Sequence, residues 1–246
     1  MNKKFLTEPV KQSLIIYGRH AVMAALANPK RHIEKIWCTK ENVAEITKVS
    51  KISPKVVERK DIDKLLGNDV VHQGFALFCS RLEDITLDEL LKMADEYKDC
   101  HVLILDQVTD PQNVGAIIRS AVAFNTLALI VQDKNSPLES GAMDKAAAGM
   151  IECLPIVRVT NLSRALEQLK QSGFWVVGMD GYAKTTIAEM KKGGKIAIVM
   201  GSEGKGMRRL VEEGCDMTVK LPISEKTESL NVATAAAIAL YEINKK

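Results

Sequence analysis

Short apolar runs alternate with amphipathic segments along this chain from residue 14 almost to its end. Compact apolar runs predict buried strands, and apolar residues three and four positions apart predict helices. The first third therefore contains predicted strands at 14–16, 33–38, 55–58 and 75–78 and predicted helices at 20–27, 43–49 and 61–66. These elements predict a small α/β domain over 13–80, of ordinary domain size. Residues 1–12 are polar and predict a mobile tail.

The same alternation continues after a linker and a first helix at 81–97. Further strands are predicted at 102–106, 127–131, 156–159, 174–178, 196–200 and 217–221. Further helices are predicted at 113–124, 143–149, 162–171, 206–213 and 229–242. Gly173 is expected to end its helix in a left-handed conformation. Repeated strand–helix alternation predicts a parallel sheet with helices on both faces, here over 98–246.

The most informative turn carries the sequence DPQNVGAIIR at 110–119. Pro111 ends the preceding strand, and Asn113 is expected to cap the following helix. Gly115 would let another backbone or a ligand come close, and Arg119 places a fixed cation on the same helix. Open α/β folds bind ligands at the carboxyl ends of their strands, so the amide and the cation indicate a site. An ordinary capped helix with a surface arginine is the alternative.

Two later turns follow the same plan of strand, polar or glycine-rich turn and helix. GSEGKGM occupies 201–207, and LPISEKTESLNV occupies 221–232 before an alanine-rich helix. The glycine loop is not a Walker A phosphate loop, because Gly206 follows Lys205 where that motif needs serine or threonine. It also lacks the spacing of a dinucleotide-binding loop, which argues against a nucleotide-binding protein. Three such turns predict loops that converge on one pocket.

These three motifs, in this order, resemble those of the SpoU (TrmH) class of RNA ribose 2′-O-methyltransferases. Upstream, YGRHAVMAALANPKR at 17–31 and VVHQGFAL at 70–77 resemble the substrate-binding domain of the branch that methylates guanosine in 23S ribosomal RNA. The resemblance covers the chain apart from roughly its first dozen residues. It implies an enzyme that uses S-adenosylmethionine. It also implies a C-terminal SPOUT domain with a trefoil knot around 201–242 and a smaller N-terminal RNA-binding domain.

The resemblance also implies which residues hold the cofactor. They combine a backbone that can be approached closely with apolar side chains for adenine, and they are Gly201, Leu221, Ile223, Ser229 and Leu230. One departure affects this loop, because Glu225 stands where the family often has glycine. The fine placement of cofactor or RNA over the loop is therefore open.

Arg119 is the catalytic residue that the resemblance indicates most strongly. A guanidinium with a pKa above about 12 is a poor general base. We therefore expect it to hold the target phosphate and to stabilise charge on the 2′-oxygen. Asn113 would orient Arg119 or the ribose, and Glu203 would order Arg119 by charge pairing. Ser229 and Asn231 complete the expected catalytic set, and helix capping is the alternative role for both.

RNA binding is expected mainly in the first domain. Residues 1–80 carry 14 basic and 8 acidic side chains, a net charge of +6, whereas the remainder carries 20 and 23, a net charge of −3. A positive lobe of this kind fits a phosphate-binding region. By resemblance, the RNA-binding residues are Arg19, His20, Lys30, Arg31, His72 and Gln73, with Arg208 and Arg209 beside the site.

Composition excludes several other classes of protein. No apolar run approaches the roughly 20 residues needed to span a bilayer, and the N-terminus lacks a signal-peptide core, so a cytoplasmic protein is expected. The five cysteines and four histidines are scattered, which predicts buried thiols and no metal site.

The partners expected from the resemblance are ribosomal RNA and a second copy of the chain. The final helix carries a face of small residues that permits close helix approach and favours a homodimer: Ala233, Ala235, Ala236, Ala237 and Ala239. Two other functions stay open. One is methylation of transfer RNA, and the other is a non-catalytic RNA-binding assembly factor of the same fold.

Overall fold

The computed structural model describes residues 14–245, which form two compact units. The N-terminal unit comprises the described residues up to Leu82 together with Glu139–Gly141. The C-terminal unit comprises Glu83–Leu138 and Ala142–Lys246 as far as it is described. The return of 139–141 to the first unit has no signal in the sequence. The tail predicted at 1–12 lies outside the described residues.

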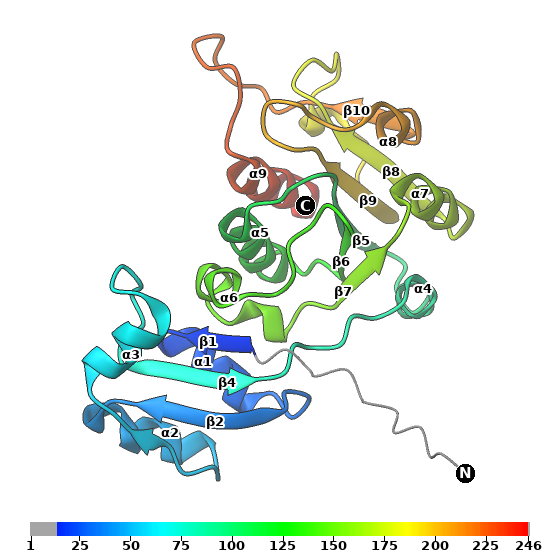
Figure 1. The fold of residues 1–246 in the computed structure, drawn as a ribbon. Coiled ribbons are helices and arrows are strands. Elements are labelled where there is room, and N and C mark those ends of the chain that lie inside the picture. The colour runs from blue at the N-terminus through cyan, green and yellow to red at the C-terminus, as the bar shows by residue number, and fades with distance from the viewer. Residues whose placement is uncertain (1–13, 246) are drawn as a thin grey trace, which may run out of the picture. The chain divides into compact units, whose positions relative to one another are not determined.

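The N-terminal unit is built on a four-stranded mixed sheet in the order β1-β4-β2-β3. Its strands are β1 (Leu14–Tyr17), β2 (Ile33–Cys38), β3 (Lys55–Val56) and β4 (Phe75–Cys79). Side chains from α1 (Arg19–Ala27) and α2 (Val43–Val49) share one core with alternate residues of β1, β2 and β4. Both helices therefore cover the same face of the sheet (Figure 1). The short helix η1 (Lys40–Asn42) precedes α2, and α3 (Arg59–Leu66) follows β3.

The C-terminal unit contains a six-stranded sheet in the order β10-β8-β9-β5-β6-β7. Every neighbouring pair is parallel, which confirms the predicted parallel sheet. The strands are β5 (Cys100–Leu105), β6 (Leu129–Gln132), β7 (Ile156–Val159), β8 (Phe174–Met179), β9 (Lys195–Met200) and β10 (Met217–Val219). The turns that follow β5, β8 and β9 consequently lie at one edge of the sheet.

Helices cover both faces of this sheet, as predicted (Figure 1). One face carries α4 (Leu87–Ala94), α7 (Leu162–Gln171) and α8 (Arg209–Glu213), and the other carries α5 (Pro111–Ala123), α6 (Gly141–Ala147) and α9 (Val232–Asn244). Single turns of 3₁₀ helix form η2 (Met150–Glu152) and η3 (Ile187–Glu189). These layers confirm the predicted α/β class, and the trefoil knot stays a prediction.

Gly115 and Gly173 both behave as the sequence indicates. A Cβ on Gly115 would lie 2.4 Å from the carbonyl oxygen of Met143, so its absence lets α6 pack closely against α5. Gly173 follows α7 with a φ of 85°, the left-handed conformation expected after a helix. Among the described residues, no helix is long and apolar enough to cross a bilayer.

Several helices begin elsewhere than predicted. α5 begins at Pro111 and is capped by Asp110, whose Oδ1 accepts from the Gln112 N–H at 3.1 Å. Capping by Asn113 was therefore a wrong prediction, because an earlier carboxylate and a proline at the first helical position define the start. α9 begins at Val232 rather than at 229, with Asn231 as its cap.

Candidate functional site

A cavity of about 560 Å³ lies at the carboxyl edge of the C-terminal sheet. Segments after β8, β9 and β10 and the approach to α9 form its walls. Every residue that the sequence assigned to the cofactor lines it, as does Glu203: Gly201, Leu221, Ile223, Ser229 and Leu230. The structure thus brings the second and third motifs to one place. That these residues hold the cofactor stays a proposal.

The loop at 201–207 closes on itself by backbone hydrogen bonds. Ser202 N donates to Gly206 O at 3.1 Å, and Gly206 N donates to Ser202 O at 2.9 Å. Gly206 has a φ of 66°, which a side chain would oppose. A Cβ on Gly201 would lie 2.2 Å from the carbonyl carbon of Gly206. Gly201 is therefore required for the loop to fold back beside the strand end.

A buried ion pair fixes the end of this loop. Asp106, at the end of β5, is fully buried and accepts from Arg208 three times: from N at 2.7 Å, from Nε at 2.8 Å and from Nη2 at 2.7 Å. The Arg208 guanidinium is thus bound to Asp106, whereas Arg209 is exposed and pairs with Glu213 on its own helix. This geometry indicates a structural role for Arg208 in addition to any RNA contact.

The first and third motifs meet through two asparagines. Asn231 Oδ1 accepts from the N–H groups of Ala233 and Thr234, so its amide nitrogen is the group that faces Asn113. Asn231 Nδ2 donates to Asn113 Oδ1 at 2.9 Å. The helices α5 and α9 that carry them pack side by side (Figure 1). Asn231 therefore caps α9 and links it to Asn113, whereas Ser229 is not the cap.

Arg119 lies apart from the cofactor cavity in a single chain. It is exposed on α5 and is not among the residues that line the cavity. Within 14–245 its guanidinium forms no hydrogen bond or ion pair, and Glu203 forms none with it. The predicted pairing of Arg119 with Glu203 is therefore not formed within one chain. Its charge is available to an external anion.

The chemistry of the cavity suits S-adenosylmethionine. Leu221, Ile223 and Leu230 supply apolar surface for an adenine ring. Asp180 and Glu203 supply negative charge, which suits a ligand with a sulfonium and an ammonium group. The volume falls in the usual range for small-ligand pockets, about 300–1,000 Å³. The lining also contains Lys205 and Lys220, and Glu212 and Glu228 offset their charge.

One wall of the cavity carries no recognisable sequence motif. Met179, Asp180 and Tyr182 line it after β8, and the Tyr182 side chain is 97% exposed. The available signal was positional, because β8 is a parallel strand and its carboxyl end must meet those of its neighbours.

The residues predicted to bind RNA in the N-terminal unit differ in accessibility. His20, Lys30 and Gln73 are exposed, and so is Arg19, which pairs with Glu45. The other two predicted residues, Arg31 and His72, are buried.

Arg31 and His72 are both buried and hydrogen-bonded within the fold. Arg31 donates through Nη2 to Glu139 at 2.7 Å and through Nη1 to the carbonyl oxygen of Ser80 at 3.0 Å. His72 Nε2 lies 2.8 Å from Asp63 Oδ1, and its Nδ1 accepts from the Gly74 N–H at 3.1 Å. Their geometry favours support of the surrounding loops over direct contact with RNA.

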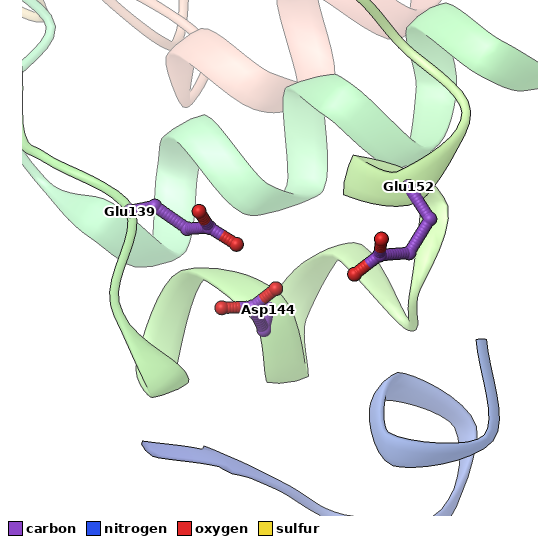
Figure 2. Close-up of side chains that lie close together, drawn as sticks. All are labelled: Glu139, Asp144 and Glu152. Carbon is purple, nitrogen blue, oxygen red and sulfur yellow. The ribbon is translucent and has the colours of Figure 1, made fainter. Parts of the chain in front are cut away.

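Two carboxylates of the C-terminal unit, Asp144 on α6 and Glu152 in η2, face each other with oxygens within 4.8 Å (Figure 2). Both have interaction partners within the fold. The third carboxylate drawn there, Glu139, belongs to the N-terminal unit, where Arg31 neutralises it. Acidic side chains alone do not define a metal site, and none is assigned.

The cysteines show no sign of nucleophilic chemistry. All five are free thiols; Cys38 and Cys79 are buried as expected, whereas Cys153 is exposed. Burial raises the pKa of the Cys215 thiol to about 12, so it stays protonated and packs near Gly178.

Two family models match the chain. Residues 101–241 match the model of the SpoU rRNA Methylase family, and residues 15–85 match that of the RNA 2′-O ribose methyltransferase substrate-binding domain. The chain belongs to the SpoU rRNA methylase family. It is an S-adenosylmethionine-dependent RNA 2′-O-methyltransferase, as its resemblance predicted.

Individual members of the SpoU family are similar over nearly the full length. The 23S rRNA (guanosine-2′-O-)-methyltransferase RlmB of Pseudomonas putida is 37% identical, with 92% of this chain and 94% of RlmB covered. YacO of Bacillus subtilis, which bears the name of a TrmH family tRNA/rRNA methyltransferase, is 36% identical over 94% of this chain and 95% of its own. The SpoU methyltransferase AviRb of Streptomyces viridochromogenes, solved with AdoMet, superposes with a TM-score of 0.80 at 20% identity, covering 94% of this chain and 89% of AviRb.

Proposed function

We propose that this SpoU-family enzyme methylates the ribose 2′-hydroxyl of a guanosine in 23S ribosomal RNA, in the cytoplasm. The observation that carries the proposal is the 37% identity to RlmB of Pseudomonas putida, which extends through both units. The N-terminal unit supports it as well, because the substrate-binding model matches residues 15–85. Transfer RNA is the competing substrate, because YacO bears the name of a tRNA/rRNA methyltransferase.

The cofactor supplies an electrophilic methyl group when it is bound, so the protein mainly positions the reactants. Gly201 and the apolar residues Leu221 and Leu230 would hold it against the strand ends. Asn113 and Asn231, already hydrogen-bonded to each other, would orient the ribose. Arg119 would hold the target phosphate and stabilise the negative charge that develops on the 2′-oxygen.

Arg119 would act at the cavity of a second subunit. We infer a homodimer, because Arg119 does not line the cavity of its own chain. Ala236 and Ala239 of α9 are buried and α9 packs on α5 of the same chain, so part of the small-residue face is already used. Ile238 and Tyr241 of α9 stay 41% and 53% exposed and offer apolar surface to the second copy.

Mixed dimers test the shared site. Co-expression of Arg119→Ala with Gly201→Ala chains would restore one complete site in heterodimers, although each homodimer is inactive. Recovery of activity on mixing supports sharing. If native mass spectrometry shows that heterodimers form and the mixture is still inactive, the shared site is contradicted.

The substrate proposal is tested by mapping 2′-O-methylation in 23S ribosomal RNA from cells with and without the protein. We expect one 2′-O-methylguanosine to disappear and to return with the wild-type chain. Purified protein should also methylate unmodified 23S RNA in preference to transfer RNA. Methylation of transfer RNA alone would replace the substrate, and absence of S-adenosylmethionine binding in calorimetry would favour a non-catalytic assembly factor.

The role of Arg119 is tested by the pH–rate profile of Arg119→Lys. If the residue acts by fixed charge, lysine restores part of the rate without a new pKa in the profile. A lysine variant that regains most of the rate only above a new pKa near its own would instead support a general base.

A further inference from the structure

The face of the N-terminal sheet opposite α1 and α2 carries an aromatic pair and lysines. The pairing register aligns Lys35 of β2 with Phe78 of β4 and Trp37 of β2 with Lys55 of β3. The Trp37 and Phe78 rings lie 5.5 Å apart between centroids. Lys35 Nζ lies 4.1 Å from the Phe78 centroid, and Lys55 Nζ lies 4.9 Å from the Trp37 centroid.

The surroundings of Trp37 add further positive charge. A shallow hollow beside the ring is lined by Lys40, Lys55 and Lys64 together with Glu58 and Asp61. The two acids are committed elsewhere, because they form the capping box of α3. Lys35, Lys40, Lys55 and Lys64 are exposed, and none forms an ion pair with any residue in 14–245.

Unpaired lysines around the half-buried Trp37 ring, which packs on the buried Phe78 ring, favour single-stranded nucleic acid over protein. Lysines bind phosphates, and an aromatic face stacks a base of any identity. Stacking of a base is stronger than a solvent-exposed cation–π contact, so a base can displace Lys35 or Lys55 from the rings. The displaced ammonium groups would then turn to the phosphates on either side of that base.

The surface also continues from the loops that the sequence assigned to RNA. Thr39, two residues after Trp37, donates its N–H to the carbonyl oxygen of Gly74 at 3.1 Å. Asn42 donates to the carbonyl oxygen of Gln73 at 3.1 Å. An RNA strand that contacts Gln73 is therefore next to the edge that carries Lys40 and Trp37.

We propose that Lys35, Trp37, Lys40, Lys55 and Lys64, with Phe78 packed behind the Trp37 ring, form a stacking surface that binds a single-stranded segment of the substrate RNA next to the methylated region. The inference deepens the proposed function and rests on it for the identity of the RNA. Arg31 and His72 are buried, so this surface adds accessible cations to the exposed Lys30 and Arg19 of the motifs.

Fluorescence of Trp37 provides the direct test. Trp175 is the only other tryptophan, so a Trp175→Phe chain reports Trp37 alone. The probe is an oligouridylate of about twelve nucleotides, at about 0.1 M salt. Stacking predicts saturable quenching of Trp37 emission. Saturable binding of the probe in anisotropy with no change in Trp37 emission would overturn the proposal.

Matched variants separate this surface from general charge. The double variant Lys35→Ala/Lys55→Ala and the variant Trp37→Leu should each lower the affinity for the oligouridylate by about tenfold. The control Lys48→Ala/Lys51→Ala removes the same charge from exposed positions of the same unit and should leave affinity within about twofold. Equal weakening by both double variants would overturn the proposal. Circular dichroism and S-adenosylmethionine affinity verify that each variant folds. If Trp37→Leu misfolds, Lys35→Ala/Lys55→Ala still tests the proposal.

Activity measurements keep the two proposals distinguishable. On 23S RNA, the surface variants should raise KM by about tenfold and leave kcat unchanged. Quenching by oligouridylate without any methylation of ribosomal RNA would refute the proposed substrate and leave the surface intact. Methylation with normal KM in both surface variants would refute the surface alone.

Discussion

Asn231 joins the start of the last helix to Asn113 on α5, with Nδ2 donating to Oδ1 at 2.9 Å. The same side chain caps α9 through its amide oxygen Oδ1, which accepts from the N–H groups of Ala233 and Thr234. One amide therefore sets the position of a helix and the spacing of two motifs that are distant in sequence. This dual use explains why capping and catalytic roles could not be separated in the sequence.

Substitution at Asn113 should affect the reaction more than the fold. Asn113→Ala leaves the Asn231 cap in place, so we expect a loss of only about 1 kcal/mol in unfolding free energy. Methyl transfer should fall by at least about tenfold if the pair orients the ribose. Asn113→Asp, which keeps an acceptor for Asn231, is the matched control. Urea unfolding and single-turnover rates measure the two effects, and equal rates for Ala and Asn would remove the orienting role.

Arg119→Ala should be nearly silent in stability and severe in activity. The side chain is exposed and unpaired among the described residues, so unfolding free energy should change by less than about 0.5 kcal/mol. Loss of a charge-stabilising group should lower kcat by about 100-fold or more. Thermal unfolding and steady-state kinetics check this. A large loss of stability would indicate a structural arginine instead.

The neighbouring arginines 208 and 209 should behave oppositely. Arg208→Ala strands the fully buried Asp106 carboxylate, which should cost about 3 kcal/mol or more. Arg209→Ala breaks only an exposed pair with Glu213, worth about 0.5 kcal/mol or less. Chemical denaturation measures both. If Arg208→Ala instead unfolds like wild type and loses only RNA affinity, the residue is a phosphate contact.

Gly201→Ala should abolish cofactor binding by steric conflict. The new methyl would lie 2.2 Å from the backbone of Gly206, and that loop cannot retreat without leaving the cavity wall. Gly181→Ala adds the same methyl to the same cavity where no atom lies within 4 Å. Calorimetry with S-adenosylmethionine should show a loss of more than about tenfold for Gly201→Ala only. Normal binding by both variants would contradict this account of the loop.

His101 should make the protein less stable in mild acid. Burial in β5 lowers its pKa from 6.5 to about 4, so the folded chain keeps it neutral while the unfolded chain protonates it. The contribution of neutral His101 to the free energy of unfolding is fully present above about pH 6.5 and is lost as the pH falls toward 4. Between about pH 7 and pH 5 the loss should be about 2 kcal/mol. His101→Gln should remove that part of the pH dependence in urea unfolding, whereas exposed His32→Gln should not.

The sequence predicted the strands well because buried parallel strands are continuous apolar runs. It predicted helix starts less well, since Asp110 and Asn113 are both good caps and only the chain geometry selects between them. The motifs did indicate which residues of the glycine loop and of the loop before α9 line the cavity. The wall at 179–182 was not indicated, because its residues reach the cavity through strand order rather than through any local pattern.

Burial of charged motif residues was also beyond the sequence. Arg31 reads as a surface cation until Glu139, distant along the chain, is found beside it. The same applies to Arg208 and Asp106. Long-range pairing of this kind leaves no periodicity, so residue type alone overestimates how many cations are available to RNA.

The order of strands in the C-terminal sheet has a consequence for biosynthesis. Its central pair joins β5 (Cys100–Leu105) to β9 (Lys195–Met200). During synthesis, β5 therefore cannot pair with β9 until most of the unit has been translated. Pairing of such distant segments is slow. A nascent chain released early would expose β5 as an unpaired edge, which makes truncated products prone to aggregation.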